Sequence, residues 1–571
     1  MAMRLSALSV HDEAVQSTTF GGNFLFNRDE LGDDPTQFNA LADELGVDAL
    51  RYPGGAVTEF MFDLENPDST VGYDIRGDVQ ELVPLSEFMA YAEASGKSVT
   101  IVLPTRDFLS KAIDGNGNRF AQFDDDLIRD FVTDVVRGDY GDVQIDGFEI
   151  GNEYWGSGGM SSVEYGRLAS RMAAVIDDTL DKLEDQADWV QDTDVIVQAG
   201  TNYNYSKLDD EYADLNGTQA ILDQIEQDYG VSLSDDVIRD GGGISWNAIN
   251  NELLIDKFDT PEELAAVDAV AHHLYTRDHD PLEEPEFALS TVDQFWESRF
   301  PDIKTYITEY NQKANTANFT EDDYGLKNAH ELLNIIEEMT DHGVEQGHVW
   351  PLSQWTENAL SRGFAFEKLT PTGEMFKMMN EELPGLRSVQ FQGALGREAE
   401  ASSANERLNV HAFASEDKLV MYFASNADQS ISYDVELSNL ITGGADIDVT
   451  VLGVEDSTAP GNKNASATVQ ERNPDQVVRD NTVEADLNPH EIMQVVIEQP
   501  EWTPQMAEFI DAGETPETTD DPFPLPVRDP LESLPPDEEE EAETDTSDDD
   551  MFEGMDILLM LLPLLALAGF G

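Results

Sequence analysis

Two glutamates, Glu153 and Glu309, each stand at the end of a short apolar segment, GFEIGN and KTYIT respectively. Such segments are typical of buried strands, so we expect both carboxylates to emerge from a core. Two carboxylates that share one pocket can flank a single acetal bond. One protonates the leaving oxygen, and the other attacks the anomeric carbon or activates water. Because both cannot ionise cheaply, one pKa should rise and supply the acid.

Eight short β-branched or apolar segments could position these residues, at 18–26, 49–55, 98–105, 147–153, 194–202, 267–275, 304–311 and 342–350. Amphipathic helical patterns lie between them, for example at 163–183 and 326–343. The strict alternation of strand and helix segments along the chain predicts parallel strands joined by crossover helices. The predicted fold class is therefore α/β, a (β/α)8 TIM barrel over residues 18–384. The alternative, an open doubly wound sheet, would show a Gly-rich phosphate loop after the first strand, and FGGNFLFNRDE lacks that spacing.

The remaining residues predict further parts of the chain. Residues 385–499 alternate apolar and polar positions between Asn, Asp, Gly and Ser, which predicts a small antiparallel β-sandwich. We assign residues 1–17 to an N-terminal strand or extension. Residues 500–550 are acidic and Pro-rich, so we expect a disordered linker. Residues 551–571 form a hydrophobic C-terminal tail.

The strand motifs resemble a known group of enzymes. GFEIGNEYW and YITEYN resemble the acid/base and nucleophile strands of clan A retaining glycoside hydrolases. LRYPGG resembles the second-strand signature of families 39, 51 and 79, the β-xylosidase, arabinofuranosidase and heparanase/β-glucuronidase branches. The resemblance implies that Glu153 is the general acid/base, that Glu309 is the nucleophile, and that Asn152 contacts the substrate 2-hydroxyl.

Other strand ends supply candidate binding residues. Arg51, at the end of the second strand, is expected to keep one carboxylate ionised, because a guanidinium holds a carboxylate with two hydrogen bonds. A salt bridge in the barrel floor is its alternative role. Gly54 and Gly55 are expected to let the chain turn tightly at the site. His273 and Tyr275 share one face of the sixth strand by alternation.

The resemblance gives these two a role as well: Tyr275 is expected to contact the nucleophile, and His273 to bind a sugar hydroxyl. Trp355 is expected to form an aromatic floor for the sugar, and Trp155, with Tyr154, to line an adjacent subsite; packing is the alternative for all three.

Further polar residues are weaker candidates. Glu59 is expected to be a surface charge, with contact to sugar hydroxyls as the alternative, and Arg277 or Arg362 could recognise one uronate. The His pair at 272–273 lacks a clear third ligand, so we expect neither a metal ion nor a cofactor. The segment Asp114–Asn118 resembles a calcium loop but has Arg119 where Gly is needed, and we interpret it as a turn.

Composition excludes several classes of protein. The 571 residues include 32 Lys and Arg against 117 Asp and Glu, a formal net charge of −85. Such a field repels phosphate backbones, so nucleic acid is not an expected partner. The absence of cysteine rules out disulfides, thiol catalysis and thiolate metal sites. Self-repulsion on this scale is tolerable where salt screens it, in a marine, halophilic or extracellular setting.

The chain ends bear on localisation. The first 15 residues hold no apolar segment of signal-peptide length, so we expect no Sec-type signal. The apolar residues 557–571 are shorter than the roughly 20 needed to cross a bilayer. We expect them to serve type-I export machinery, which makes the protein extracellular. A weak membrane anchor and a tail without a role are the alternatives.

Together these patterns predict a retaining glycoside hydrolase that acts on an oligo- or polysaccharide by double displacement. The alternative is a secreted, non-catalytic carbohydrate-binding or surface protein on a hydrolase barrel. A lyase or phosphohydrolase has less support, because the sequence offers neither a phosphate loop nor a convincing metal cluster. The sugar, the linkage, exo or endo action and the oligomeric state are left open.

Overall fold

The computed structural model describes residues 2–239, 241–277, 289–290, 294–300, 302–314, 316, 319–391, 401–455 and 458–512. Most of the predicted linker and all of the hydrophobic tail lie outside these residues. Among the helices described, none is both long and apolar enough to cross a membrane.

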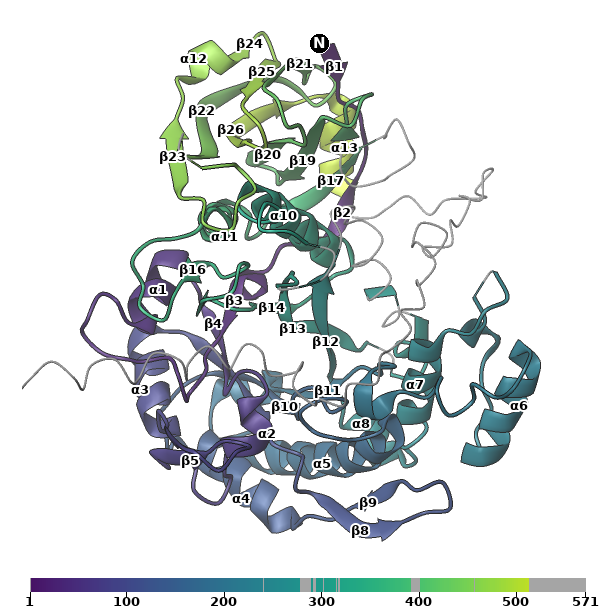
Figure 1. Ribbon diagram of the computed structural model, residues 1–571. Coiled ribbons are helices and arrows are strands. Elements are labelled where there is room, and N and C mark those ends of the chain that lie inside the picture. Colours follow the sequence, from purple (N-terminus) through teal and green to yellow (C-terminus); the bar gives the residue numbers. More distant parts are fainter. Residues whose placement is uncertain are drawn as a thin grey trace, which may run out of the picture. The chain divides into compact units, whose positions relative to one another are not determined.

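A closed barrel of eight parallel strands forms the first part of the chain (Figure 1). Each of the eight predicted strands is present, so the predicted (β/α)8 barrel is confirmed. The strands, in chain order, are β3 (Gly21–Asn23), β4 (Ala49–Tyr52), β7 (Ser98–Leu103), β10 (Ile145–Ile150), β11 (Asp194–Gln198), β12 (Ala269–Thr276), β13 (Lys304–Gln312) and β14 (Gln346–Val349).

Helices follow the strands and cover the barrel. The main ones are α1 (Phe38–Leu45), α3 (Leu85–Ser95), α4 (Asp125–Val136), α5 (Ser162–Leu183), α7 (Trp246–Ile255), α10 (Leu326–Asp341) and α11 (Pro371–Glu382). Their ends agree with local sequence signals. Ser161 caps α5 through a capping box with Glu164, and Gly46 and Gly96 end α1 and α3 in the left-handed conformation.

Additional short elements lie in the loops that connect the barrel strands and helices. These are α2 (Val57–Met61), the hairpins β5 (Val71–Tyr73) with β6 (Val79–Glu81) and β8 (Leu109–Ile113) with β9 (Arg119–Ala121), η2 (Asp188–Asp192), η3 (Asn204–Ser206), α6 (Thr218–Tyr229), η4 (Asp235–Val237), α8 (Pro261–Ala265), and β15 (Ser353–Gln354) with β16 (Ser361–Arg362). The segment Asp114–Asn118 is the turn between β8 and β9. Its Asp114 carboxylate accepts from the backbone of Asn116 and Asn118 and pairs with Arg167 at 2.6 Å, as a turn residue does.

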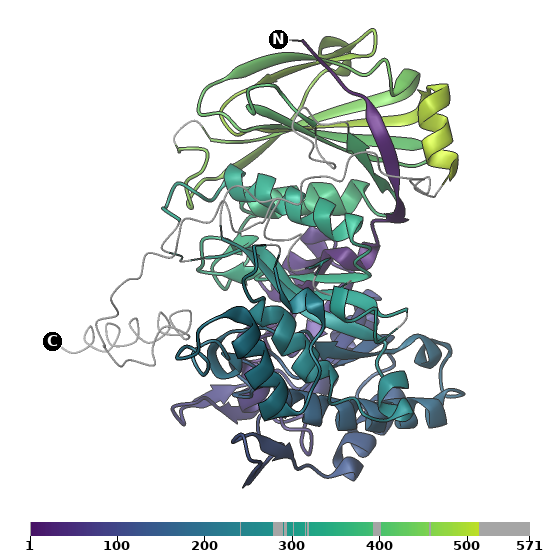
Figure 2. The same ribbon diagram turned by 90° about the vertical axis from the view of Figure 1, so that its right-hand side faces the viewer.

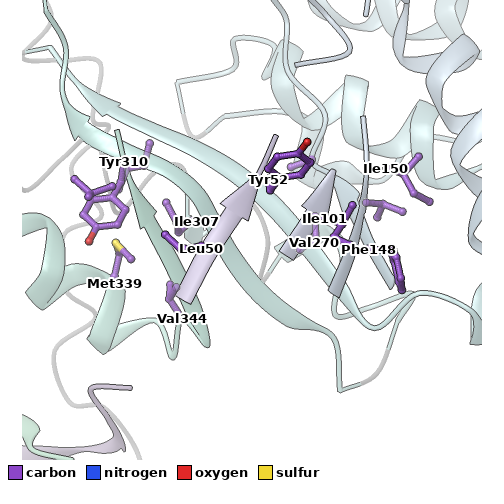
Figure 3. Close-up of a cluster of buried hydrophobic side chains, with 14 of the residues drawn as sticks. Leu50, Tyr52, Ile101, Phe148, Ile150, Val270, Ile307, Tyr310, Met339 and Val344 are labelled. Carbon is purple, nitrogen blue, oxygen red and sulfur yellow. The ribbon is translucent and has the colours of Figure 1, made fainter. Parts of the chain in front are cut away.

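Buried apolar side chains fill the space between the strands and the helices. Figure 3 labels residues that point outward from the strands, such as Leu50, Ile101, Phe148 and Ile307, and Met339 of α10. Alternation along each strand therefore leaves the neighbouring side chains inside the barrel. Arg51, Glu149 and Thr308 occupy such inner positions.

A second core lies in a β-sandwich (Figure 2), which confirms the predicted second architecture. One sheet has the order β2-β17-β19-β20-β26-β22-β23, with β18 beside β19, and the other has the order β1-β21-β25-β24. The strands are β17 (Arg387–Phe391), β18 (Ala401–Ser402), β19 (Leu408–Ala414), β20 (Lys418–Ser425), β21 (Ile431–Glu436), β22 (Ile441–Val454), β23 (Ala467–Glu471), β24 (Val478–Arg479), β25 (Thr482–Leu487) and β26 (Ile492–Trp502), with helix α12 (Pro474–Val477) before β24.

The two chain ends of the described part both join this sandwich. β1 (Ala2–Arg4) pairs with β21 and β2 (Ala7–Ala14) with β17, before η1 (Ser17–Phe20) leads into the barrel. The linker predicted from residue 500 onward is wrong in its first part. β26 continues through Trp502, and helix α13 (Pro504–Ala512) buries Met506 and Ile510 against the sandwich core. Two apolar residues at helical spacing outweigh the acidic composition there.

Candidate active site

The carboxylates of Glu153 and Glu309 meet at the carboxyl end of the barrel strands. Glu153 follows β10, and Glu309 lies within β13. The Nδ1 atom of His273 lies 3.2 Å from Glu153 Oε1 and 3.6 Å from Glu309 Oε2. One oxygen of each carboxylate and this nitrogen all lie within 4.8 Å of one another. The two residues that the sequence places together therefore share one site.

A bulge in β13 turns Glu309 into the barrel. His272 pairs with Ile307 and His273 pairs with Glu309, so Thr308 is an extra residue in β13. Thr308 donates to a buried carboxylate inside the barrel, and Glu309 also faces inward. Strict alternation would send one of these two neighbours toward the helices.

The side chain of Arg51 is completely buried and contacts two carboxylates, those of Glu149 and Glu309. It donates to Glu149 at 2.6 and 3.0 Å, and its Nη1 donates to Glu309 Oε1 at 3.2 Å. Further hydrogen bonds join it to Asn23 at 3.0 Å and to Asn152 at 2.9 Å. The expected contact between Arg51 and a site carboxylate is present, although its shorter ion pair is with Glu149.

Glu149 is a residue that the sequence analysis missed. Its carboxylate also accepts from Gln198 at 3.1 Å and from Thr308 at 3.2 Å. A charged residue in the middle of the apolar strand segment GFEIGN was the available signal, because a buried charge needs a partner. Here the partner is Arg51, so Glu149 offsets the guanidinium charge in the barrel interior.

Both oxygens of Glu309 carry hydrogen bonds. Oε1 accepts from Arg51, and Oε2 accepts from the Tyr275 hydroxyl at 2.6 Å. The Glu309 side chain is 6 % exposed, whereas that of Glu153 is 33 % exposed. Tyr275 therefore lies where the resemblance placed it, and Glu309 is the more enclosed of the two carboxylates.

The carboxylates around His273 favour the protonated form of its imidazole. Burial lowers the pKa of the His273 imidazole, but the carboxylates of Glu309 and Glu153 outweigh it and raise that pKa above its ordinary value. Burial raises the pKa of Glu153, but the hydrogen bond and charge of His273, together with Lys313 and Arg51, lower it overall. The expected rise of one glutamate pKa is thus not found for Glu153, whose pKa is lowered.

Asn152 lies in the site with its side chain already bonded. Its Oδ1 accepts from Arg51, and its Nδ2 donates to Ser157 Oγ at 3.4 Å. The residue is 1 % exposed. Its neighbour Glu153 has a φ of 43°, a left-handed conformation that is rare for a residue other than glycine.

Glu59 holds the backbone beside this strained residue. The expectation of a surface charge is wrong, because Glu59 is 5 % exposed. Its carboxylate accepts from the backbone amides of Thr105, Arg106 and Asn152, each at 2.8 Å, and from the Thr105 hydroxyl. Burial raises the pKa of Glu59, although these hydrogen bonds oppose the shift. No sequence pattern pointed to this role, because Glu59 lies in α2, outside the strands.

The tight turn after β4 brings backbone close to an aromatic ring. Gly55 has a φ of 72°, and a Cβ atom there would lie 2.7 Å from the ring of Trp350. A Cβ at Gly54 would lie 3.0 Å from Asn23 Oδ1. Both glycines are therefore needed for close approach, as expected. Trp350, at the end of β14, was missed; its place directly after a strand was the signal.

The other aromatic candidates lie in different surroundings. Trp355 is 53 % exposed and its ring centroid is 6.5 Å from that of Phe364. Trp155 contacts the site, with a ring centroid 5.9 Å from that of His273. Tyr154 is buried and stacks on Tyr165 at 4.3 Å, so packing accounts for it rather than a subsite.

The two arginines proposed for a uronate lie apart in the chain. Arg362 donates to the Lys463 backbone oxygen at 3.0 Å and to the Asn464 side chain, so the sandwich already holds its guanidinium. This binding overturns the expectation for Arg362. Arg277 follows β12 directly.

Glu153, His273 and Glu309 offer three ligand atoms that could hold a metal ion. A carboxylate and an imidazole are suitable donors for zinc and similar ions. Arg51 lies 3.2 Å from Glu309, however, and an ion would have to displace the proton of His273. The donor set thus fits a metal ion only after a proton is lost.

Comparisons with known proteins address the fold. No protein-family model matches the chain, and no curated protein is significantly similar to it in sequence. Several solved structures share the architecture. The family 51 arabinofuranosidase from Xanthomonas axonopodis pv. citri has a TM-score of 0.55 at 13 % identity, over 87 % of this chain and 100 % of that chain.

Two further structures agree with this. The α-L-arabinofuranosidase from Thermotoga maritima has a TM-score of 0.55 at 15 % identity, covering 87 % and 99 % of the two chains. A family 44 xyloglucanase from Paenibacillus polymyxa has a TM-score of 0.50 at 12 % identity, covering 87 % and 99 %. The clan A resemblance read from the strand motifs is thereby confirmed for the fold: the chain has the barrel-and-sandwich fold of clan A glycoside hydrolases.

Proposed function

We propose that the protein is a retaining glycoside hydrolase. The observation that carries the proposal is the short distance between two carboxylates in one open site. Their nearest oxygens lie within 4.8 Å, in a geometry close to the roughly 5–5.5 Å between the carboxyl groups of retaining enzymes. Inverting enzymes need about 6.5–9.5 Å to admit a water molecule.

The hydrogen bonds support the assignment of roles. Glu309, whose oxygens accept hydrogen bonds from Arg51 and Tyr275, attacks the anomeric carbon and forms a covalent glycosyl ester. Glu153, which is the more exposed carboxylate, donates a proton to the leaving oxygen. It then takes a proton from the water that releases the sugar. The shared architecture of family 51 and family 44 glycoside hydrolases supports the same reading.

We assign the proton of this scheme to His273. Its Nδ1 lies 3.2 Å from Glu153 Oε1, and the neighbouring carboxylates raise the pKa of the imidazole. Transfer of this proton to Glu153 as the leaving oxygen approaches would give the acid form that the first step requires. Once Glu309 is esterified, one negative charge is gone and Glu153 can act as the base.

The experiment is a screen of aryl glycosides and polysaccharides with the wild type and with Glu309→Gln. The proposal predicts hydrolysis by the wild type, loss of it in the variant, and a first-formed product of unchanged anomeric configuration by NMR. Inverted product, or equal activity in the variant, would contradict it. Absence of hydrolysis combined with saturable sugar binding would favour the non-catalytic alternative instead.

A further inference from the structure

Exposed large apolar side chains concentrate on one face of the barrel. Among the described residues, all but two of these side chains lie in segments that follow the carboxyl ends of barrel strands; the exceptions, Leu8 and Val469, are in the sandwich. In a chain with a net charge of −85, a restricted set of exposed aromatic rings needs a reason.

Two aromatic pairs stand out within this set. Tyr203 and Tyr205, 58 % and 57 % exposed, follow β11. Trp355 and Phe364, 53 % and 41 % exposed, follow β14. Strands β12 and β13, which carry His273, Tyr275 and Glu309, lie between β11 and β14 in the barrel, whereas Glu153 follows β10, the other neighbour of β11. The two pairs therefore lie on either side of Glu309, and the first pair follows the strand next to that of Glu153.

The first pair is connected to the site by contacts. The backbone amide of Tyr205 donates to the carbonyl oxygen of Trp155 at 3.0 Å. The ring of Trp155 is in turn 5.9 Å from that of His273, centroid to centroid. Trp155 thus connects the imidazole of His273 to the segment that carries the exposed tyrosines.

The second pair is fixed from the strand that carries Glu309. Asn311, two residues further along β13, donates to the carbonyl oxygens of Trp350 at 2.9 Å and Asn358 at 3.0 Å. These bonds hold both ends of the loop that contains Trp355. Arg28 reaches the same loop from the segment after β3, with its guanidinium 5.5 Å from the ring centroid of Phe364. In the barrel, β3 lies directly opposite β11.

We propose that the pairs Tyr203/Tyr205 and Trp355/Phe364 bind sugar units of one neutral polysaccharide chain on the two sides of Glu309, and that Glu153 and Glu309 cut that chain internally. This inference rests on the proposed function. Aromatic rings offer flat apolar faces that stack on the C–H faces of sugar rings at little conformational cost. The strongly negative net charge disfavours anionic polymers such as polyuronates.

The test compares small and polymeric substrates. Both double variants, Tyr203→Ala/Tyr205→Ala and Trp355→Ala/Phe364→Ala, are assayed beside Tyr73→Ala, an exposed tyrosine (61 %) on the β5–β6 hairpin that serves as the control. We expect kcat/KM for an aryl glycoside to change less than about twofold. For the neutral polysaccharide of the same sugar, kcat/KM should fall about tenfold in each double variant and stay unchanged in the control. Wild-type enzyme should lower the viscosity of the polymer before much reducing sugar appears.

Three results would overturn the inference. They are release of single sugars from chain ends only, an equal loss on both substrates, or no loss on the polymer. Affinity electrophoresis of Glu309→Gln through gels that contain a neutral polysaccharide or a polyuronate separates this inference from the proposed function. Retardation by the neutral polymer that the aromatic substitutions abolish supports binding, whatever the wild type hydrolyses. Retardation by the polyuronate alone contradicts it.

Discussion

Two regions of the molecule bring histidine and glutamate together, and their surroundings shift the pKa of a histidine in opposite directions. At the barrel mouth, His273 faces two carboxylates, which raise its pKa. Between the barrel and the sandwich, His330 of α10 faces His411 of β19, with their Nε2 atoms 3.4 Å apart. Burial and the neighbouring imidazole lower the pKa of His330 to about 3.

The two clusters differ in how exposed their carboxylates are. His411 pairs with Glu337 at 2.7 Å and both side chains are buried, whereas the Glu153 side chain is 33 % exposed. At the mouth, two carboxylates share one imidazole beside a third charge, Arg51. The same residue types therefore form a buried contact in one place and, under the proposed function, hold the catalytic proton in the other. A partly exposed carboxylate distinguishes the cluster to which chemistry is assigned.

The largest difference in kcat is expected between two Glu→Gln variants, one in each cluster. Glu309→Gln should lower kcat by about 10⁵-fold, since it removes the nucleophile. Glu337→Gln should leave kcat within about twofold. It should instead lower the free energy of unfolding by about 2 kcal/mol, because a charge-assisted buried hydrogen bond is weakened.

Steady-state kinetics and urea unfolding measure the two effects. Glu345→Gln, at an exposed position after α10, controls for the loss of a charge and should shift stability by no more than about 0.5 kcal/mol. Comparable kinetic losses in the Glu309 and Glu337 variants would remove the distinction between the clusters.

A smaller effect is expected from substituting Glu59, which holds the backbone of the active site in place. Glu59→Gln leaves an amide that cannot accept the four hydrogen bonds of the carboxylate, so the backbone at Asn152 and Glu153 loosens. We expect kcat to fall about 10- to 100-fold while KM changes little. Glu65→Gln, an exposed residue just beyond α2, is the matched control. A change in KM alone, or a loss that only follows reduced stability, would contradict a positioning role.

The histidines of the two clusters can be compared through pH profiles of kcat/KM. Because the pKa of His273 is raised, activity should be present below that pKa and be lost as pH rises through it. In His273→Asn the proton must reside on Glu153, so the basic limb should move to lower pH by on the order of one unit. His330→Asn should leave the profile unchanged. Equal shifts in both variants, or none in His273→Asn, would show that the mouth proton lies elsewhere.

The smallest effect expected concerns metal ions. EDTA should leave activity unchanged, because the proposed chemistry uses carboxylates and a proton. Added Zn²⁺ should inhibit in competition with substrate through Glu153, His273 and Glu309, more strongly as pH rises and His273 loses its proton. Inhibition should weaken in His273→Asn. Loss of activity in EDTA with recovery on adding metal would instead indicate a metal-dependent enzyme.

The sequence predicted the strands well and the supporting contacts less well. Short apolar segments that alternate with helical patterns located all eight barrel strands. Alternation of side chains along a strand placed His273 and Tyr275 on one face, because burial imposes a period of two. It could not reveal the extra residue Thr308, since a bulge leaves no pattern in a single sequence. Glu59 was misread because its partners are backbone amides from distant loops.

The sequence patterns were incomplete at two other points. Residues 500–512 are acidic, yet Met506 and Ile510 bury against the sandwich. Trp355 was expected to form the sugar floor, whereas Trp350, which packs on the turn at Gly55, was not among the candidates. A motif shows which residue types follow a strand, whereas loop geometry decides which of them faces the site.

The central claim is tested most directly by trapping the covalent intermediate. An activated 2-fluoro glycoside of the preferred sugar should inactivate the wild type with time, and mass spectrometry should find the added sugar on the peptide that contains Glu309. Glu309→Gln should remain unlabelled. Attachment to another residue, or turnover of the preferred substrate with inverted configuration and no trapped ester, would contradict the account.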